Sequence, residues 1–133
     1  MLNKRKKKFS LKDRIKSLRY ALRGLKVLWQ SEHNARIHLV AFILVILAGL
    51  FFKISTMEWI IVLIVSFMVM ITELFNTSLE YLSDKVSSEH DELIGKSKDL
   101  SAAAVLLSAM LAVICGLVIF LPYIISSINV NTG

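Results

Sequence analysis

The sequence predicts an all-α membrane protein, in which one amphipathic helix lies at the membrane surface and three helices cross the bilayer. Two observations predict this class. Of the 133 residues, 56% are hydrophobic, the mean hydropathy is +0.65 and one residue is proline, which is too apolar for an ordinary soluble domain of this size. In addition, 12 of the 16 Lys and Arg residues precede Ile37, so positive charge is concentrated ahead of three long apolar segments.

Residues 1–9 contain the run "KRKKK" and are predicted to be a basic, disordered tail. Each Lys or Arg close to an anionic leaflet contributes about 1 kcal/mol of attraction. The tail is therefore expected to tether the chain to anionic lipid head groups, and it indicates nothing about chemistry.

Residues 10–31 are predicted to form an amphipathic helix. The stretch "SLKD" places Ser10 three residues before an acid, which is the spacing of a capping box. Apolar residues recur every three to four positions and form one stripe: Leu11, Ile15, Leu18, Leu22, Leu25 and Trp29. The cations fall mostly elsewhere on the helix: Lys12, Arg14, Lys16, Arg19, Arg23 and Lys26. This pattern predicts a helix in the membrane interface, either as a surface anchor or as one wall of a phosphate site.

Three apolar segments are predicted to cross the membrane, at about 35–52, 57–82 and 101–125, since a helical span needs roughly 20 residues. The first is the shortest and could be confused with the apolar region of a signal peptide. We expect it to persist in the mature protein, because Arg36 and His38 flank it tightly and no small-residue cleavage site follows. Residues 10–125 are thus predicted to be one membrane domain.

The distribution of cations predicts the orientation of these spans, because Lys and Arg are retained on the cytoplasmic side. Lys85, Lys96 and Lys98 lie in the polar connection 83–98, whereas the connection before the second span contains only Lys53. We therefore expect a multi-pass protein of the bacterial cytoplasmic membrane, with its N-terminus inside and its C-terminus outside. The connection 83–98 is expected to hold a helical turn or two, and residues 126–133 are expected to be a C-terminal tail.

Several classes of function are disfavoured. The net charge of +6 could suggest nucleic acid, but the cations adjoin a membrane span and no groove-reading motif is present, so anionic lipid is the better partner. Cys115 is a lone cysteine in an apolar segment, which excludes a disulfide framework and a zinc site. The sequence contains neither GxxxxGK[ST] nor GxSxG, so a P-loop and a nucleophile elbow are not expected.

The stretch "MITELFNTSLEYLSD", Met70 to Asp84, carries a polar stripe within the second span. At 100° per residue, four polar side chains each lie within about 60° of Glu73 in projection: Asn76, Thr77, Glu80 and Asp84. An ionisable residue within a span costs at least about 2.5 kcal/mol, so burial against helices or a bound ion must offset it. A structural hydrogen-bond network is the alternative, but two carboxylates in register with an amide favour a functional site.

The two carboxylates are suited to different roles. Mg²⁺ binds oxygen ligands and needs only one or two carboxylates besides phosphates and water, which suits Glu80 near the cytoplasmic end. Glu73 lies about 10 Å deeper, where a desolvated carboxylate can serve as a general base toward a lipid-embedded group. Glu32 could supply another carboxylate, whereas His33 and His38 are expected to be interfacial polar residues rather than zinc ligands.

The stretch "ELFNTSLEYLSDKVSSEHDELIGKSKDLSAAAVLL", Glu73 to Leu107, closely resembles the signature region of the prokaryotic diacylglycerol kinase family, which includes the undecaprenol kinases. The shared pattern is E-x-x-N-[ST]-[AS]-[IL]-E, then D, then K-D-x-x-[AS]-A-A-V-L. The stretch "YALRGLKVLWQSEHNARIH" resembles the amphipathic helix and first-span entry of that family. The resemblance covers about Ser10 to Pro122.

This resemblance implies a homotrimer with three spans and an interfacial helix per subunit, whose active sites lie between subunits. It implies transfer of the γ-phosphoryl group of MgATP to the hydroxyl of a membrane lipid, with Glu73 as general base and Asn76 orienting the hydroxyl. Glu32 and Glu80 would hold Mg²⁺. The implied nucleotide contacts are Tyr20, Glu32, Glu80, Glu89, His90, Asp91, Lys98 and Asp99, and the implied lipid contacts are Arg14, Arg23, Trp29 and Glu73.

The lipid itself is left open by the resemblance. The stretch "SEHNARIH", with His38 where some relatives carry an acid, is more similar to the undecaprenol kinase branch, so undecaprenol is slightly favoured over diacylglycerol. Two rival interpretations also remain. One is an oligomeric transport protein that uses Glu73 and Glu80 as a proton or cation relay, and the other is a membrane scaffold whose polar stripe only holds helices together.

Overall fold

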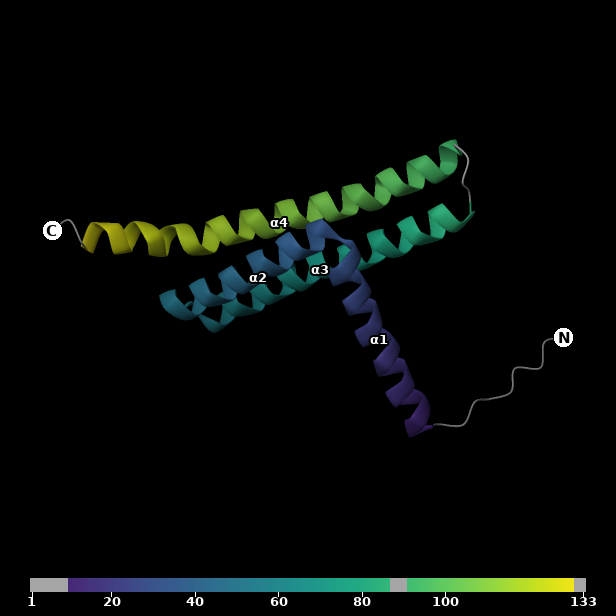
Figure 1. Ribbon diagram of the computed structural model, residues 1–133. Coiled ribbons are helices and arrows are strands. Elements are labelled where there is room, and N and C mark those ends of the chain that lie inside the picture. Colours follow the sequence, from purple (N-terminus) through teal and green to yellow (C-terminus); the bar gives the residue numbers. More distant parts are fainter. Residues whose placement is uncertain (1–9, 87–90, 131–133) are drawn as a thin grey trace.

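The computed structural model describes residues 10–86 and 91–130, which form four helices. They are α1 (Leu11–Ser31), α2 (His33–Phe52), α3 (Thr56–Val86) and α4 (Glu92–Val130). The predicted all-α class is therefore confirmed, and α2, α3 and α4 are each long and apolar enough to cross a membrane. α3 and α4 run side by side along the long axis of the molecule. α2 overlies α3 in this view, and α1 leaves the bundle at a steep angle (Figure 1).

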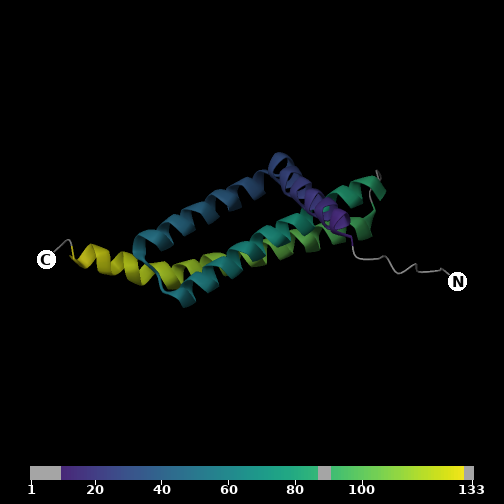
Figure 2. The same ribbon diagram turned by 90° about the horizontal axis from the view of Figure 1, so that it is seen from below.

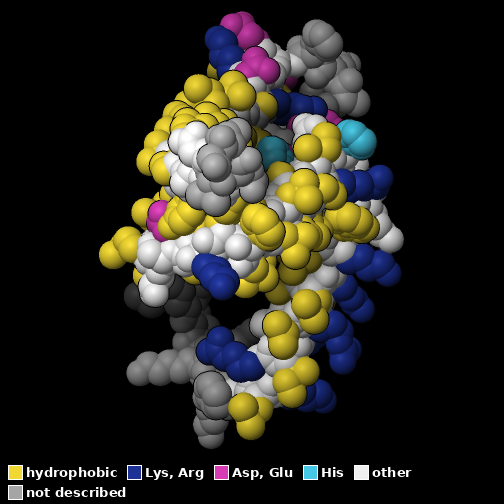
Figure 3. Space-filling view, turned by 90° about the vertical axis from the view of Figure 1, so that its left-hand side faces the viewer, with side chains coloured by type: hydrophobic (Ala, Val, Ile, Leu, Met, Phe, Trp, Pro, Cys, Tyr) yellow, Lys and Arg dark blue, Asp and Glu magenta, His cyan; other side chains and the backbone are white. Residues whose placement is uncertain are grey.

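α1 begins where the sequence predicts, because the Ser10 side chain accepts a hydrogen bond from the Asp13 amide at 3.3 Å. All of its side chains except Leu28 are exposed, including the whole apolar stripe. Lys and Arg side chains form a row along one edge of the molecule, beside apolar side chains (Figure 3). An amphipathic helix without a protein partner for its apolar face suits the membrane interface.

The chain turns between α1 and α2 at Glu32, which has an extended backbone (φ −108°, ψ 116°). The Arg36 guanidinium holds this corner. Its Nε donates to the carbonyl of Trp29 at 2.8 Å and a terminal nitrogen donates to the carbonyl of Gln30 at 2.7 Å. Carbonyls in the last turn of a helix lack intrahelical partners, so a cation that binds them stabilises the helix end.

The opposite end of the bundle is held by tight packing. Lys53 adopts a left-handed conformation (φ 52°) at the end of α2, and Ile54 then packs against Val62 and Ile119. The carboxylate of Glu58 accepts from the Ser55 amide at 2.7 Å and from the Tyr123 hydroxyl at 2.9 Å, which ties α3 to α4.

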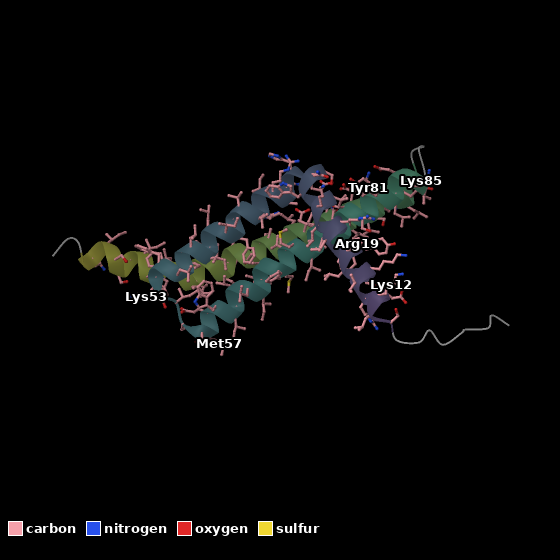
Figure 4. The ribbon with its side chains drawn as sticks, turned by 60° about the horizontal axis from the view of Figure 1, so that its bottom comes forward. Lys12, Arg19, Lys53, Met57, Tyr81 and Lys85 are labelled. Carbon is pink, nitrogen blue, oxygen red and sulfur yellow. The ribbon has the colours of Figure 1, made fainter. Side chains whose placement is uncertain are left out.

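α2 diverges from α3 and α4 between that end and its junction with α1 (Figure 2). Figure 4 shows which residues lie toward each end of the long axis, with Lys53 and Met57 toward one end and Tyr81 and Lys85 toward the other. Lys12 and Arg19 of α1 lie in the same half as Lys85. The half of α3 that contains Glu73, Asn76 and Glu80 is therefore the half nearest the basic helix.

Two predicted segments need correction. Most of the predicted connection 83–98 is helical, since α3 continues to Val86 and α4 begins at Glu92. The reason is a side-chain cap that the prediction omitted: the Asp91 carboxylate accepts from the amides of Leu93 and Ile94 at 2.8 and 3.2 Å. The predicted tail 126–133 is also helical as far as Val130, because α4 continues through Pro122.

Candidate active site

Glu73 is a buried acid in the half of α3 nearest α1. Its exposed fraction is 2%, and its Oε1 lies 3.3 Å from Nε2 of His38 in α2. That contact would be an ion pair with a protonated imidazole, but it lacks the alignment of a hydrogen bond, and Oε1 has no hydrogen-bond partner within the described residues. The Oγ1 of Thr77, one turn along the helix, is likewise buried and unpartnered there. A buried carboxylate with a free oxygen is equipped to receive a proton from a ligand.

The two histidines have different surroundings. His38 is half-buried against Glu73, so it belongs to the surroundings of the acid. His33 is exposed, and the interfacial position expected of both residues stays a prediction.

A chain of hydrogen bonds extends from Asn76 toward the end of α3 that carries Lys85. The Asn76 side-chain NH2 group donates to Glu80 Oε1 at 3.1 Å, and the Asn76 carbonyl oxygen accepts from the Ser101 hydroxyl of α4 at 2.7 Å. Further along, the Lys98 ammonium donates to the Asp84 carboxylate at 3.0 Å. The predicted polar face of α3 is therefore real, and α4 supplies partners for two of its residues, Asn76 and Asp84.

Two further acids are candidates for a site with Glu73. Glu32 lies at the corner between α1 and α2, and Glu80 lies on α3, seven residues after Glu73. Among residues 10–86 and 91–130, however, no group of three or more His, Cys, Asp or Glu side chains is close enough to enclose a metal ion. Any cation held here would therefore need additional ligands from outside those side chains.

The predicted site residues of α1 lie on the exposed surface of that helix. Arg14, Tyr20, Arg23 and Trp29 are all exposed on α1. The guanidinium of Arg23 lies over the Tyr20 ring, 5.9 Å from its centroid, an arrangement that favours a cation–π attraction.

The remaining predicted nucleotide contacts lie in the connection after α3 and in the first turns of α4. Asp91 caps α4 and Asp99 is exposed on its surface. Glu89 and His90 lie outside the described residues, so their predicted nucleotide contacts stay predictions.

An apolar cavity of about 380 Å³ lies beside the site, between α2, α3 and α4. His38 is part of its wall, which is otherwise formed chiefly by aliphatic and aromatic side chains such as Phe42, Val62, Val69, Ala109 and Phe120. Because His38 also contacts Glu73, the cavity begins next to the buried carboxylate.

Comparison with known proteins decides the family. The family described as "Prokaryotic diacylglycerol kinase" matches residues 19–120. The chain belongs to the prokaryotic diacylglycerol kinase family. This agrees with the resemblance drawn from "ELFNTSLEYLSD", and it makes the protein an ATP-dependent membrane lipid kinase.

Individual members of the diacylglycerol kinase family are similar over most of the chain. The undecaprenol kinase of Bacillus subtilis (strain 168) is 34% identical over 107 residues, which are 80% of this chain and 87% of that protein. The diacylglycerol kinase of Escherichia coli (strain K12) is 32% identical over 100 residues, 75% of this chain and 82% of that protein. The diacylglycerol kinase of Synechocystis sp. is 37% identical over 111 residues, 83% of this chain and 63% of that protein. The transport interpretation gains no support from these relatives.

The sequence does not predict two hydroxyl residues of α4 that bond to α3. The Ser101 hydroxyl lies 2.7 Å from the Asn76 carbonyl oxygen, and the Ser108 hydroxyl lies 2.8 Å from that of Thr72. A small hydroxyl residue within an apolar helix is the one signal that could have drawn attention to them, because such residues often make hydrogen bonds between membrane helices.

Proposed function

We propose that this kinase transfers the γ-phosphoryl group of MgATP to the hydroxyl of a membrane lipid alcohol, with undecaprenol slightly favoured over diacylglycerol. One observation carries the proposal: Glu73 is 2% exposed on a membrane-spanning helix and keeps one carboxylate oxygen without a hydrogen-bond partner among the described residues. A carboxylate that is costly to bury is retained where it has chemistry to perform.

In the proposed reaction, Glu73 removes the proton from the lipid hydroxyl. The hydroxyl oxygen forms the new bond to the γ-phosphorus, the bond from that phosphorus to the bridging oxygen breaks, and ADP leaves with the electron pair. Asn76 helps to orient the hydroxyl, and direct transfer requires no phosphoenzyme. Such transfer depends mainly on positioning and charge neutralisation.

Glu32 and Glu80 are proposed to hold Mg²⁺. These side chains fit that ion, because both carboxylates are half-buried and therefore still accessible, and Mg²⁺ characteristically takes one or two carboxylates together with substrate phosphates. When bound, Mg²⁺ would neutralise charge on the phosphates. Lys98 and Asp99 are proposed to contact the nucleotide, together with Tyr20, Glu89, His90 and Asp91, whereas Arg14, Arg23 and Trp29 are proposed to line the lipid approach.

The orientation and assembly belong to the same proposal. We expect the N-terminus and the active site on the cytoplasmic side and the C-terminus outside, since Lys12, Arg19 and Lys85 lie in one half of the molecule (Figure 4). Anionic lipid head groups would bind the basic side of α1. A homotrimer would give the exposed apolar sides of α2, α3 and α4 helical partners and would place each active site between subunits.

The proposed lipid preference rests on the residues around His38. The preference for undecaprenol comes from "SEHNARIH", and His38 within it contacts the proposed base. The apolar cavity next to His38 offers space for part of a hydrocarbon chain, whether isoprenyl or acyl. Hydrophobic walls do not distinguish these chains, so the lipid must be tested directly.

The test is transfer of labelled γ-phosphate from MgATP in detergent micelles, with undecaprenol and diacylglycerol offered separately. The wild type is compared with Glu73→Gln and with Glu92→Gln, which changes the same chemical group on an exposed side chain at the start of α4. Label in undecaprenol with the wild type and Glu92→Gln, absent with Glu73→Gln, supports the proposal. Label in diacylglycerol alone overturns the preferred lipid, and equal labelling by Glu73→Gln overturns the assigned base.

A further inference from the structure

Ser101 is the first donor in a chain of hydrogen bonds that ends on the carboxylate of Glu80, which is proposed to bind magnesium. Its exposed fraction is 9%, and its hydroxyl donates to the Asn76 carbonyl oxygen at 2.7 Å. The NH2 group of the same Asn76 side chain donates to Glu80 Oε1 at 3.1 Å. The order Ser101, Asn76, Glu80 therefore crosses from α4 to α3 and then follows α3 for one turn.

The chemistry of these groups gives the chain its direction. An ionised carboxylate only accepts hydrogen bonds, so Asn76 must present its NH2 group to Glu80. Its carbonyl oxygen then faces α4 and requires a donor, which a hydroxyl supplies and a methyl group does not. Without that donor, the amide can rotate and bring its own oxygen toward the Glu80 carboxylate, where the two oxygens repel each other.

We infer that Ser101 is a positioning residue, which fixes the side-chain amide of Asn76 and through it the orientation of the Glu80 carboxylate. The inference rests on the proposed function, in which Glu80 serves the magnesium nucleotide. Because Ser101 acts through Asn76 on Glu80, its loss is expected to raise the KM for MgATP. Since Asn76 is also proposed to orient the lipid hydroxyl, kcat is expected to fall as well, with little change in the KM for the lipid.

The same pair of helices provides a matched control at Ser108. Its exposed fraction is 6%, and its hydroxyl lies 2.8 Å from the Thr72 hydroxyl of α3. The Ser101 and Ser108 hydroxyls also lie 2.8 Å from the carbonyl oxygens of Lys98 and Val105, so in both residues the single hydroxyl proton is shared with the backbone in the same way. Ser108→Ala thus removes a comparable bond between α3 and α4 without changing the partners of Asn76.

The experiment compares four full-length proteins in micelles: the wild type, Ser101→Ala, Ser101→Thr and Ser108→Ala. The apparent KM for MgATP, the apparent KM for the lipid and kcat are measured with the lipid that the wild type phosphorylates. In parallel, the thermal shift produced by the magnesium complex of AMP-PCP, an ATP analogue that cannot donate its γ-phosphoryl group, reports nucleotide binding without turnover.

The inference predicts that Ser101→Ala raises the KM for MgATP about fivefold, the value of one net hydrogen bond, and leaves the KM for the lipid within about twofold. The analogue-induced thermal shift should fall in Ser101→Ala, recover in Ser101→Thr and remain normal in Ser108→Ala. Equal KM values for MgATP in the two alanine variants, or failure of threonine to restore the shift, overturns the inference.

Two further measurements cover the cases in which Ser101→Ala does not fold or the wild type labels no lipid. If Ser101→Ala does not fold, Ser101→Cys decides by the same criteria, because a thiol occupies a similar position but donates weakly. If the folded wild type labels no lipid, the proposed function fails, whereas the analogue still tests Ser101. A thermal shift reduced in Ser101→Ala but not in Ser108→Ala then supports the positioning role, and equal shifts overturn it.

Discussion

At the scale of single residues, Glu73 and Glu80 share one face of α3 but have different surroundings. Glu73 is buried and has an oxygen with no hydrogen-bond partner among the described residues, whereas Glu80 is half-buried and accepts a hydrogen bond from Asn76. The difference predicts different mutant kinetics. Glu73→Gln should lower kcat about 10²- to 10⁴-fold, the usual contribution of a general base, while MgATP still binds. Glu80→Gln should chiefly raise the KM for MgATP.

Steady-state kinetics with each substrate varied in turn, together with nucleotide binding to the inactive Glu73→Gln protein, would check this division. The comparison is internal, since the two substitutions are chemically identical and lie on one helix. Proportional changes of kcat and KM in both variants would contradict separate roles for the two acids.

Gly49 gives a second prediction at this scale, about stability. A Cβ atom at this position would lie 2.7 Å from Cη2 of the Trp59 indole, closer than packed carbon atoms can approach. Gly49→Ala should therefore displace Trp59 and destabilise the bundle by about 1–3 kcal/mol, as overpacked cores do. Gly24→Ala is the control, because among the described residues no atom beyond its own stretch of helix backbone would lie within 4 Å of its Cβ. Thermal unfolding in micelles measures both, and an unchanged midpoint for Gly49→Ala would refute the close-packing argument.

At the scale of elements, the corner between α1 and α2 sets the position of Glu32. Arg36 holds this corner through the carbonyls of Trp29 and Gln30. Arg36→Ala should loosen α1 at a cost of about 1 kcal/mol per lost bond and raise the KM for MgATP, because Glu32 would no longer be fixed. Arg36→Lys should recover only part of the effect, since an ammonium cannot reproduce the forked geometry of a guanidinium.

Limited proteolysis at the corner and the KM for MgATP would be measured on the same preparations of the Arg36 variants. Faster cleavage at the corner with an unchanged KM would show that the position of Glu32 does not affect nucleotide use, against the proposed role of that residue.

The elements also show which parts of the structure could be predicted from sequence. The capped start of α1, the three apolar helices and the polar face of α3 each follow from the spacing of residues within one helix. The bonds from Ser101 to Asn76 and from Thr72 to Ser108 depend instead on the register between α3 and α4, which intrahelical periodicity does not contain. The start of α4 depends on the cap formed by Asp91, and the polar composition of this segment does not distinguish a capped helix from a loop.

At the scale of the whole molecule, exposed apolar side chains are spread over α2, α3 and α4. Lipid covers such surfaces, but lipid cannot satisfy the buried oxygens of Glu73 and Thr77. A ligand or a neighbouring subunit can, which is why the proposed trimer matters to the chemistry. It predicts that Glu73→Gln and Lys98→Ala protomers, each inactive alone, regain activity when folded together, because a shared site can then combine an intact Glu73 with an intact Lys98.

The complementation experiment needs two comparisons. The two variants mixed after separate assembly should stay inactive if subunits exchange slowly, and light scattering of the protein–detergent complex should give the mass of three chains. Activity restored only on co-folding would mean that residues of different subunits meet in one site. A fully active wild-type monomer would instead mean that the carboxylates of one chain suffice. The Glu73 and Thr77 oxygens, which lack partners in the described part of the chain, would then have to be satisfied without a neighbouring subunit.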